Sequence, residues 1–183
     1  TQAALQDVLA IEESRLNDDT QEVANYIDAM NHGLNRLREF PLSLRLMREI
    51  HARLLASGRG SERTPGEFRY SQNWIGAQGC SLADAAYVPP AVDDMHKALG
   101  DLETFFYDCS EIPTLIKIGL IHAQFETIHP FLDGNGRMGR LLITFWLCNE
   151  GILSQPVLYL SYYFKRNRRE YYDRLMDVRF KGA

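Results

Sequence analysis

A glycine-rich segment between two apolar helical stretches constrains this chain more than any other feature. Residues 129–140 read HPFLDGNGRMGR, and Leu141 opens an apolar run. We expect a helix to begin near Gly136, so that unpaired backbone N–H groups lie at the positive end of its dipole. Glycines also let a backbone approach a phosphate closely. The segment therefore predicts an anion-binding loop that joins two helices.

The side chains of this segment supply the chemistry that a phosphate ligand needs. Asp133 can hold a divalent metal, and Arg137 and Arg140 can form paired hydrogen bonds with phosphate oxygens. His129 is the group here that can take up a proton near neutral pH. We expect the anion cradle itself to consist of Gly134, Asn135 and Gly136, with the Asn135 side chain as an added donor.

The segment resembles the motif of the Fic family, His-Pro-Phe-x-(Asp/Glu)-Gly-Asn-Gly-Arg-x-x-Arg, and matches it at every specified position. The stretch before it, HAQFETI over residues 122–128, is similar to the helix that delivers this loop in the family. Most Fic enzymes transfer AMP from ATP to a protein hydroxyl. The resemblance implies a protein adenylyltransferase acting on a Ser, Thr or Tyr hydroxyl, with ATP as co-substrate. It also implies that His129 is the general base, that Asp133 holds Mg²⁺, and that Arg140 and Arg137 bind the β- and γ-phosphates.

Apolar residues recur at helical spacing along most of the chain, which predicts a mainly α fold. Stripes run over 23–37 and 42–54, and prolines open two more at 89–106 and 113–128. The motif helix should end near Glu150, and a last helix should follow Ser161, a plausible N-cap, to Val178. We expect one Fic-type helical bundle over 1–183, with its core in 20–180 and its catalytic loop at 129–140.

Residues 66–90 break the helical pattern. Residue types typical of strands surround Trp74 and Tyr87, and Gly76 and Gly79 between them are typical of turns. This pattern predicts a short β-hairpin. In the Fic family such a hairpin, the flap, covers the active site and pairs with the backbone of the target protein. The resemblance implies that the target-binding flap residues are Trp74, Ile75, Gly76, Tyr87 and Val88.

The adenine pocket is less defined by the sequence. The pair Tyr171-Tyr172 resembles tyrosines that some relatives place near the base, so Tyr172 is the candidate for stacking on adenine. A core tyrosine at helical spacing explains the same residue equally well, and both readings stay open.

Two other motifs are rejected. The stretch 134–139 spells GxGxxG, the fingerprint of dinucleotide-binding folds. That fingerprint requires a strand before it and an acidic residue about 20 positions after it. Here a helical segment precedes the glycines, and the residues between Gly151 and Phe164 include no Asp or Glu. A zinc site built from His122, Glu126 and His129 is disfavoured because Pro130 ends the helix and no HExxH occurs. We expect His122 and Glu126 to pack and hydrogen-bond so that they steady the loop.

Composition narrows the partners. The net charge of -4 argues against nucleic-acid binding through this domain, and no apolar run approaches membrane-span length. The scattered thiols Cys80, Cys109 and Cys148 suggest a cytoplasmic protein.

The chain reads as a fragment of a longer protein, similar to relatives with an N-terminal inhibitory helix. Self-modification and a homodimer are further expectations from the resemblance. The alternatives are AMP removal, other nucleotidyl or phosphoryl transfer, or a non-catalytic module that binds nucleotide or protein.

Overall fold

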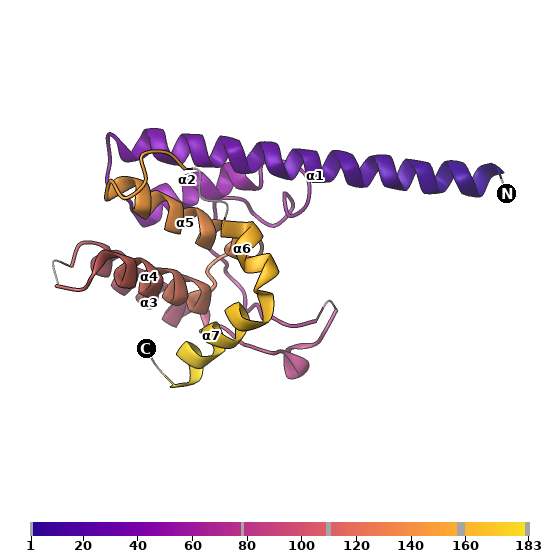
Figure 1. Ribbon diagram of the computed structural model, residues 1–183. Coiled ribbons are helices and arrows are strands. Elements are labelled where there is room, and N and C mark those ends of the chain that lie inside the picture. Colours follow the sequence, from indigo (N-terminus) through magenta and orange to yellow (C-terminus); the bar gives the residue numbers. More distant parts are fainter. Residues whose placement is uncertain (1, 78, 109–110, 157–159, 182–183) are drawn as a thin grey trace.

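The fold is a helical bundle, seen in a computed structural model that describes residues 2–77, 79–108, 111–156 and 160–181 (Figure 1). This confirms the mainly α prediction. The helices are α1 (Gln2–Leu37), α2 (Leu44–Leu54), α3 (Val92–Phe106), α4 (Thr114–Ile128), α5 (Asn135–Asn149), α6 (Leu160–Arg166) and α7 (Arg168–Lys181), with one 3-10 turn, η1 (Leu82–Asp84).

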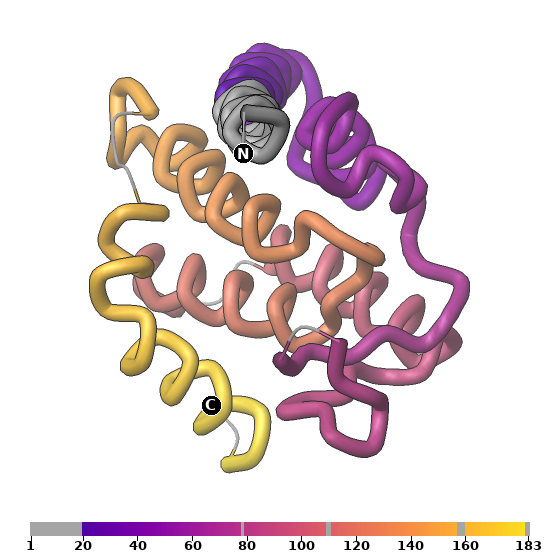
Figure 2. Tube along the Cα trace, turned by 90° about the vertical axis from the view of Figure 1, so that its right-hand side faces the viewer, coloured from indigo at the N-terminus to yellow at the C-terminus, as the bar shows by residue number. Residues whose placement is uncertain are grey.

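Helix α5 lies at the centre of the bundle. It packs against α1 and α2 on one side and against α4 on the other, and α4 in turn contacts α3 and α7 (Figure 2). The approach of α1 is close, because a Cβ at Gly33 would lie 2.4 Å from Cζ of the buried Phe145 ring. The motif helix is thus held from both sides, which gives its N-terminus a fixed position.

The stripe predicted on α1 is only partly correct. Val23 and Ile27 are 59% and 48% exposed, whereas Ala29 is fully buried and Met30 packs at the edge of the core. The other predicted stripe residues, Tyr26, Leu34 and Leu37, also pack against the core. Periodicity therefore located the helix and most of its packed face.

The predicted last helix is two helices, and the predicted N-cap is wrong. Ser161 lies inside α6, and the chain turns at Asn167 before α7 begins. The Asn167 side-chain Nδ2 donates to the Tyr163 carbonyl at 2.9 Å, and the Asn167 backbone N–H donates to the same oxygen at 3.0 Å. A short amide side chain that bonds the local backbone in this way competes with a continuous helix.

In the flap segment (residues 66–90), a single antiparallel bridge between Ile75 and Tyr87 takes the place of the expected hairpin ladder. Its two hydrogen bonds, at 2.9 and 3.1 Å, have ordinary lengths. Side chains supply much of the remaining pairing: Trp74 Nε1 donates to the Cys80 carbonyl at 3.0 Å, and Gln72 Nε2 donates to the Pro89 carbonyl at 2.9 Å. Residue 78 lies outside the described part.

None of the described helices combines the length and apolar character needed to cross a bilayer. Cys80 and Cys148 are free thiols, and Cys109 lies outside the described residues.

Candidate active site

The motif segment forms a tight loop between α4 and α5. Helix α4 ends at Ile128, and His129 follows in the left-handed region with φ 49 while its N–H donates to the Phe125 carbonyl at 2.9 Å. Pro130 cannot continue the helix. Gly134 is the N-cap of α5 with φ 76, so α5 begins one residue before the predicted start. The two left-handed residues reverse the chain and place His129 beside the N-terminus of α5.

Asn135 shapes this loop from inside. Its side chain is 2% exposed, its Oδ1 accepts from the Phe131 N–H at 2.9 Å, and its Nδ2 donates to the Phe131 carbonyl at 2.7 Å. Both ends of the amide are therefore used within the loop. In this arrangement Asn135 sets the shape of the cradle, whereas the sequence suggested that its side chain would itself be an anion donor.

His51 supports the same loop from α2, and sequence reasoning missed it. The ring is fully buried and stacks on Phe131 at 3.7 Å. Its Nδ1 accepts from the Gly66 N–H at 2.9 Å, and its Nε2 lies 3.0 Å from the Asp133 carbonyl. A Cβ at Gly134 would lie 3.2 Å from this Nε2, so glycine is required there for space as well as for φ. The available signal was a histidine on the buried stripe of α2.

Arg137 and Asp133 form a charged cluster at the N-terminus of α5. Asp133 Oδ1 accepts from the Gly134 N–H at 2.5 Å and lies 3.7 Å from Arg137 Nη2. Glu22 of α1 lies 3.5 Å from Arg137 Nη1 and 3.1 Å from Arg59 Nε. Among the described residues, Arg137 Nη2 is buried and makes no hydrogen bond. A cation with an unused buried donor is suited to an anionic ligand.

Arg140 lies one turn further along α5. Its Nε donates to the Ser161 hydroxyl at 2.9 Å, which links the motif to α6. Below it, Glu126 is 5% exposed and its Oε1 has no hydrogen-bond partner in the described structure. Burial raises the pKa of Glu126 to about 7, although the nearby Arg140 acts in the opposite direction. A Cβ at Gly139 would lie 2.5 Å from this oxygen, so α4 and α5 touch here.

His122 steadies the junction as predicted. Its Nδ1 lies 3.1 Å from the Gly139 carbonyl, and its Nε2 lies 3.0 Å from the Tyr171 hydroxyl of α7. Burial lowers the pKa of His122 to about 4, so the ring is neutral. Glu126 also packs at this junction, but the hydrogen bonds predicted for its side chain are not seen.

His129 is neutral at physiological pH. Burial is the main cause that lowers its pKa to about 4; the guanidinium groups of Arg179 and Arg69 act in the same direction, while the Glu126 carbonyl and the Asp133 carboxylate oppose them. Its buried Nδ1 has no hydrogen bond of good geometry among the described residues. Because the ring is neutral, one of its two nitrogens keeps a lone pair, as a base requires.

Of the predicted base-pocket and flap residues, Tyr172, Trp74, Gly76 and Val88 are exposed, and Ile75 and Tyr87 are partly exposed. Tyr172 is 46% exposed, with Arg168 above its ring at 5.7 Å. Tyr171, by contrast, is bonded to His122. Among the predicted flap residues, Trp74 is 42% and Val88 45% exposed, with Ile75 and Tyr87 in the bridge and Gly76 beside it.

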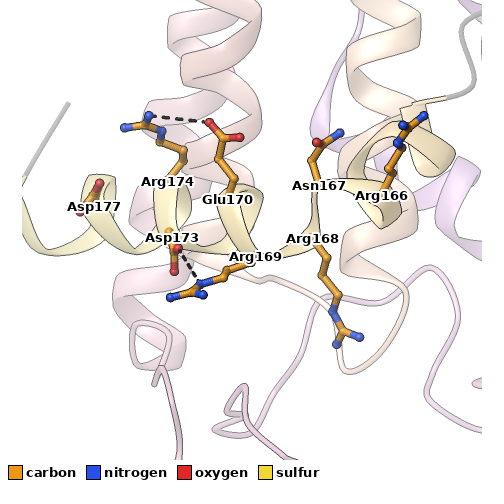
Figure 3. A pocket seen from close by; sticks show the side chains of 8 residues that line it. All are labelled: Arg166, Asn167, Arg168, Arg169, Glu170, Asp173, Arg174 and Asp177. Atoms are coloured by element: carbon orange, nitrogen blue, oxygen red, sulfur yellow. Dashed lines mark ion pairs between the residues drawn. The ribbon is translucent and has the colours of Figure 1, made fainter.

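Two hollows beside α6 and α7 contain none of the motif residues. One is a strongly charged surface hollow in which Arg174 lies 3.7 Å from Glu170 and Arg169 lies 3.9 Å from Asp173 (Figure 3). The other, about 350 Å³, lies between α4, α6 and α7 and is lined mainly by apolar groups, among them Phe164 and Tyr171. Neither competes with the loop as the site of chemistry.

The residues at the motif fit Mg²⁺ only in company with a phosphate ligand. The described part of the chain contains no group of three or more His, Cys, Asp or Glu side chains that would hold a metal by itself. Mg²⁺ commonly uses one carboxylate together with phosphate oxygens and water, and Asp133 supplies that carboxylate beside the cradle. A Cβ at Gly60 would lie 2.8 Å from Asp133 Oδ2, so a side chain there would crowd this oxygen.

Known proteins resemble this chain over most of its length. The model of the Fic/DOC family matches residues 41–147. The chain is 31% identical over 141 residues to a "Protein adenylyltransferase Fic" of Aedes aegypti, which covers 73% of this chain and 24% of that protein. It is 27% identical over 175 residues to the protein of that name from Drosophila virilis, covering 94% and 32%.

Solved structures show the same fold. A Fic family protein from Desulfovibrio desulfuricans aligns with a TM-score of 0.74 and 25% identity, covering 91% of this chain and 47% of that one. A Fic domain containing signaling protein from Bacteroides thetaiotaomicron aligns with a TM-score of 0.61 and 22% identity over 73% and 50%. The chain spans about a third or less of the length of the curated relatives described above.

Proposed function

Because the chain belongs to the Fic/DOC family, we propose that it is a protein adenylyltransferase, which transfers AMP from ATP to a Ser, Thr or Tyr hydroxyl of a target protein. The observation that carries the proposal is the neutral His129 directly after α4, in the short loop whose other end, Gly134, caps α5. Relatives named protein adenylyltransferase support the choice of AMP as the transferred group.

In this mechanism His129 takes the proton of the target hydroxyl. In the neutral ring one nitrogen carries hydrogen, and the other keeps a lone pair for the reaction. The hydroxyl oxygen attacks the α-phosphorus of ATP, a new P–O bond forms, and the bond to the β-phosphate breaks to release pyrophosphate. The negative charge of bound ATP would raise the pKa of His129 towards neutrality, where a general base is most effective.

The anionic groups are bound by the start of α5. The N–H groups of its first turn, at Gly136 and Arg137, face the phosphates, and Arg137 and Arg140 neutralise charge that develops on the leaving group. Mg²⁺ held by Asp133 would supply further charge neutralisation between the phosphates. Glu22 is the competing anion, because it already contacts Arg137.

The substrate protein would lie along the flap segment. The edge near Ile75 and Tyr87 offers backbone groups that can pair with an extended chain of any sequence. We place the adenine against Tyr172, whose ring is accessible for stacking. Self-modification, a homodimer and a cytoplasmic location complete the proposal, and size-exclusion chromatography with light scattering tests the dimer.

The test is incubation with Mg²⁺ and ATP labelled on either the α- or the γ-phosphate, with cell lysate as a source of targets. We expect α-label on protein and no γ-label. Label from the γ-position alone would indicate a phosphoryl-transferring enzyme instead. Absence of both labels, together with measurable ATP binding, would contradict AMP transfer and favour AMP removal or a binding module.

A further inference from the structure

The buried cation Arg69 occupies an unusual place between the flap segment and the catalytic loop. Its side chain is fully buried, and none of the carboxylates in the described structure pairs with it. Burial lowers its pKa. A buried charge without a counter-ion is destabilising by several kcal/mol unless hydrogen bonds compensate it. Its retention here therefore depends on the acceptors around it.

Those acceptors are three backbone carbonyls, one in the catalytic loop and two in the flap segment. Arg69 Nε donates to His129 at 3.1 Å, one Nη donates to Ser71 at 3.2 Å, and the other donates to Pro90. The backbone N–H of Arg69 also donates to the Pro130 carbonyl at 2.8 Å. A planar guanidinium can serve three directions at once, whereas an ammonium group cannot do so with the same geometry. One side chain thus joins the catalytic loop to both ends of the flap segment.

Two more side chains of the flap segment bond to the same stretch of backbone. Asn73 Nδ2 donates to the carbonyls of His129 at 3.3 Å and Phe131 at 3.0 Å. The Tyr87 hydroxyl donates to the Thr127 carbonyl at 3.0 Å. The carbonyls of alternate residues from 127 to 131 therefore all accept hydrogen bonds from the flap segment.

Helix α7 closes this arrangement from the other side. The guanidinium of Arg179 lies 4.0 Å above the Tyr87 ring, and its Nη2 donates to the Glu126 carbonyl at 2.8 Å. The flap segment lies beside α7 in both views of the molecule (Figures 1 and 2). His129 has a left-handed backbone, which is unfavourable for a residue other than glycine and persists only when its surroundings hold it.

We propose that Arg69 is a positioning residue that couples the flap segment to the catalytic loop, so that the bound target backbone and the His129 imidazole keep a fixed relation. This inference rests on the proposed AMP transfer for its consequence, although the coupling itself is a property of the folded chain. Arg69 acts through the backbone of His129 and touches no reacting atom. Its loss should therefore impair transfer without impairing nucleotide binding, because the cradle on α5 does not depend on it.

The test compares Arg69→Lys with a matched control, Arg48→Lys. Arg48 donates to the Gly66 carbonyl at the start of the flap segment and pairs with Glu67, but none of its hydrogen bonds reaches the catalytic loop. We expect Arg69→Lys to keep ATP affinity within about threefold and to lower AMP transfer about 10- to 100-fold, since small misplacements of reacting groups cost that much. Amide hydrogen exchange at the Ile75–Tyr87 bridge should become faster in Arg69→Lys and not in the control.

The proposal would be overturned if Arg69→Lys showed the same bridge exchange rate and the same AMP transfer rate as the wild type. Faster exchange spread evenly through α5 would also overturn it, because that result indicates general destabilisation. If Arg69→Lys does not fold, Asn73→Ala tests the coupling instead, because it removes two hydrogen bonds to the catalytic loop and leaves Arg69 in place. Asn73→Ala with unchanged bridge exchange would then refute the coupling. Should the wild-type chain transfer no AMP, the proposed function fails, yet bridge exchange still tests the coupling.

Discussion

Acidification should destabilise this fold through His51, a residue outside the motif. The neutral ring uses both nitrogens: Nδ1 accepts from the Gly66 N–H, which requires that Nε2 carry the hydrogen bound to the Asp133 carbonyl. Protonation would place a second N–H against that of Gly66. Burial, the main cause, accordingly lowers the pKa of His51 from 6.5 to about 4.

The direction in which the free energy of unfolding changes with pH follows from proton binding. With a folded-state pKa below that of the unfolded chain, the unfolded state binds more protons, so the stabilisation from His51 is complete above pH 6.5. It is lost as pH falls towards about 4. A pKa difference of this size corresponds to roughly 3 kcal/mol, which is a large part of the 5–15 kcal/mol typical of a domain.

The assay is urea unfolding followed by circular dichroism at several pH values between 7.5 and 4, on the wild-type chain and on His51→Gln. His122 and His129 titrate in both proteins, so their contributions cancel in the comparison. We expect the wild type to lose about 3 kcal/mol more than His51→Gln over this range. Parallel stability curves for the two proteins would refute the reasoning about the tautomer and its burial.

Three further substitutions test the packing and charges around the motif. Gly139→Ala places a methyl group 2.5 Å from Glu126 Oε1, so we expect a loss of about 1–3 kcal/mol in urea unfolding, and an unchanged midpoint would contradict the contact. Glu126→Gln should stabilise the fold at pH 8 and have little effect at pH 4.5. The folded-state pKa of about 7 lies above the ordinary value, so the wild type loses stability as pH rises through 7; equal stabilities at pH 8 would argue against this. Glu22→Gln removes the carboxylate at Arg137, and calorimetry should show ATP affinity increased about 3- to 10-fold if Glu22 competes with phosphate; weaker binding would instead make Glu22 a residue that orients Arg137.

Local signals in the sequence were enough to place the catalytic loop. Pro130 and the glycines mark its ends, and the helix after it begins at Asn135, one residue from the predicted start. The role of His122 also followed from its position about two turns before the loop. Such predictions succeed because the interacting residues are close in the chain, so helical geometry alone brings them together.

Contacts between distant segments could not be predicted in this way. His51 reaches Asp133 and Glu22 reaches Arg137 only because α1 and α2 pack around α5. The sequence gives no sign of a role for Arg69, and only the fold shows it buried against carbonyls. The division of the last helix at Asn167 depends on a side-chain bond that a periodic pattern does not reveal.

The most direct test of the central claim pairs two measurements on the wild type and on His129→Ala: ATP affinity, and AMP transfer in a single turnover. If His129 is the general base, affinity should stay within about twofold while transfer falls by at least 100-fold, since general-base catalysis contributes about that much or more. Retained transfer in His129→Ala would contradict the account, and a parallel loss of ATP affinity would show that His129 binds the nucleotide rather than taking the proton.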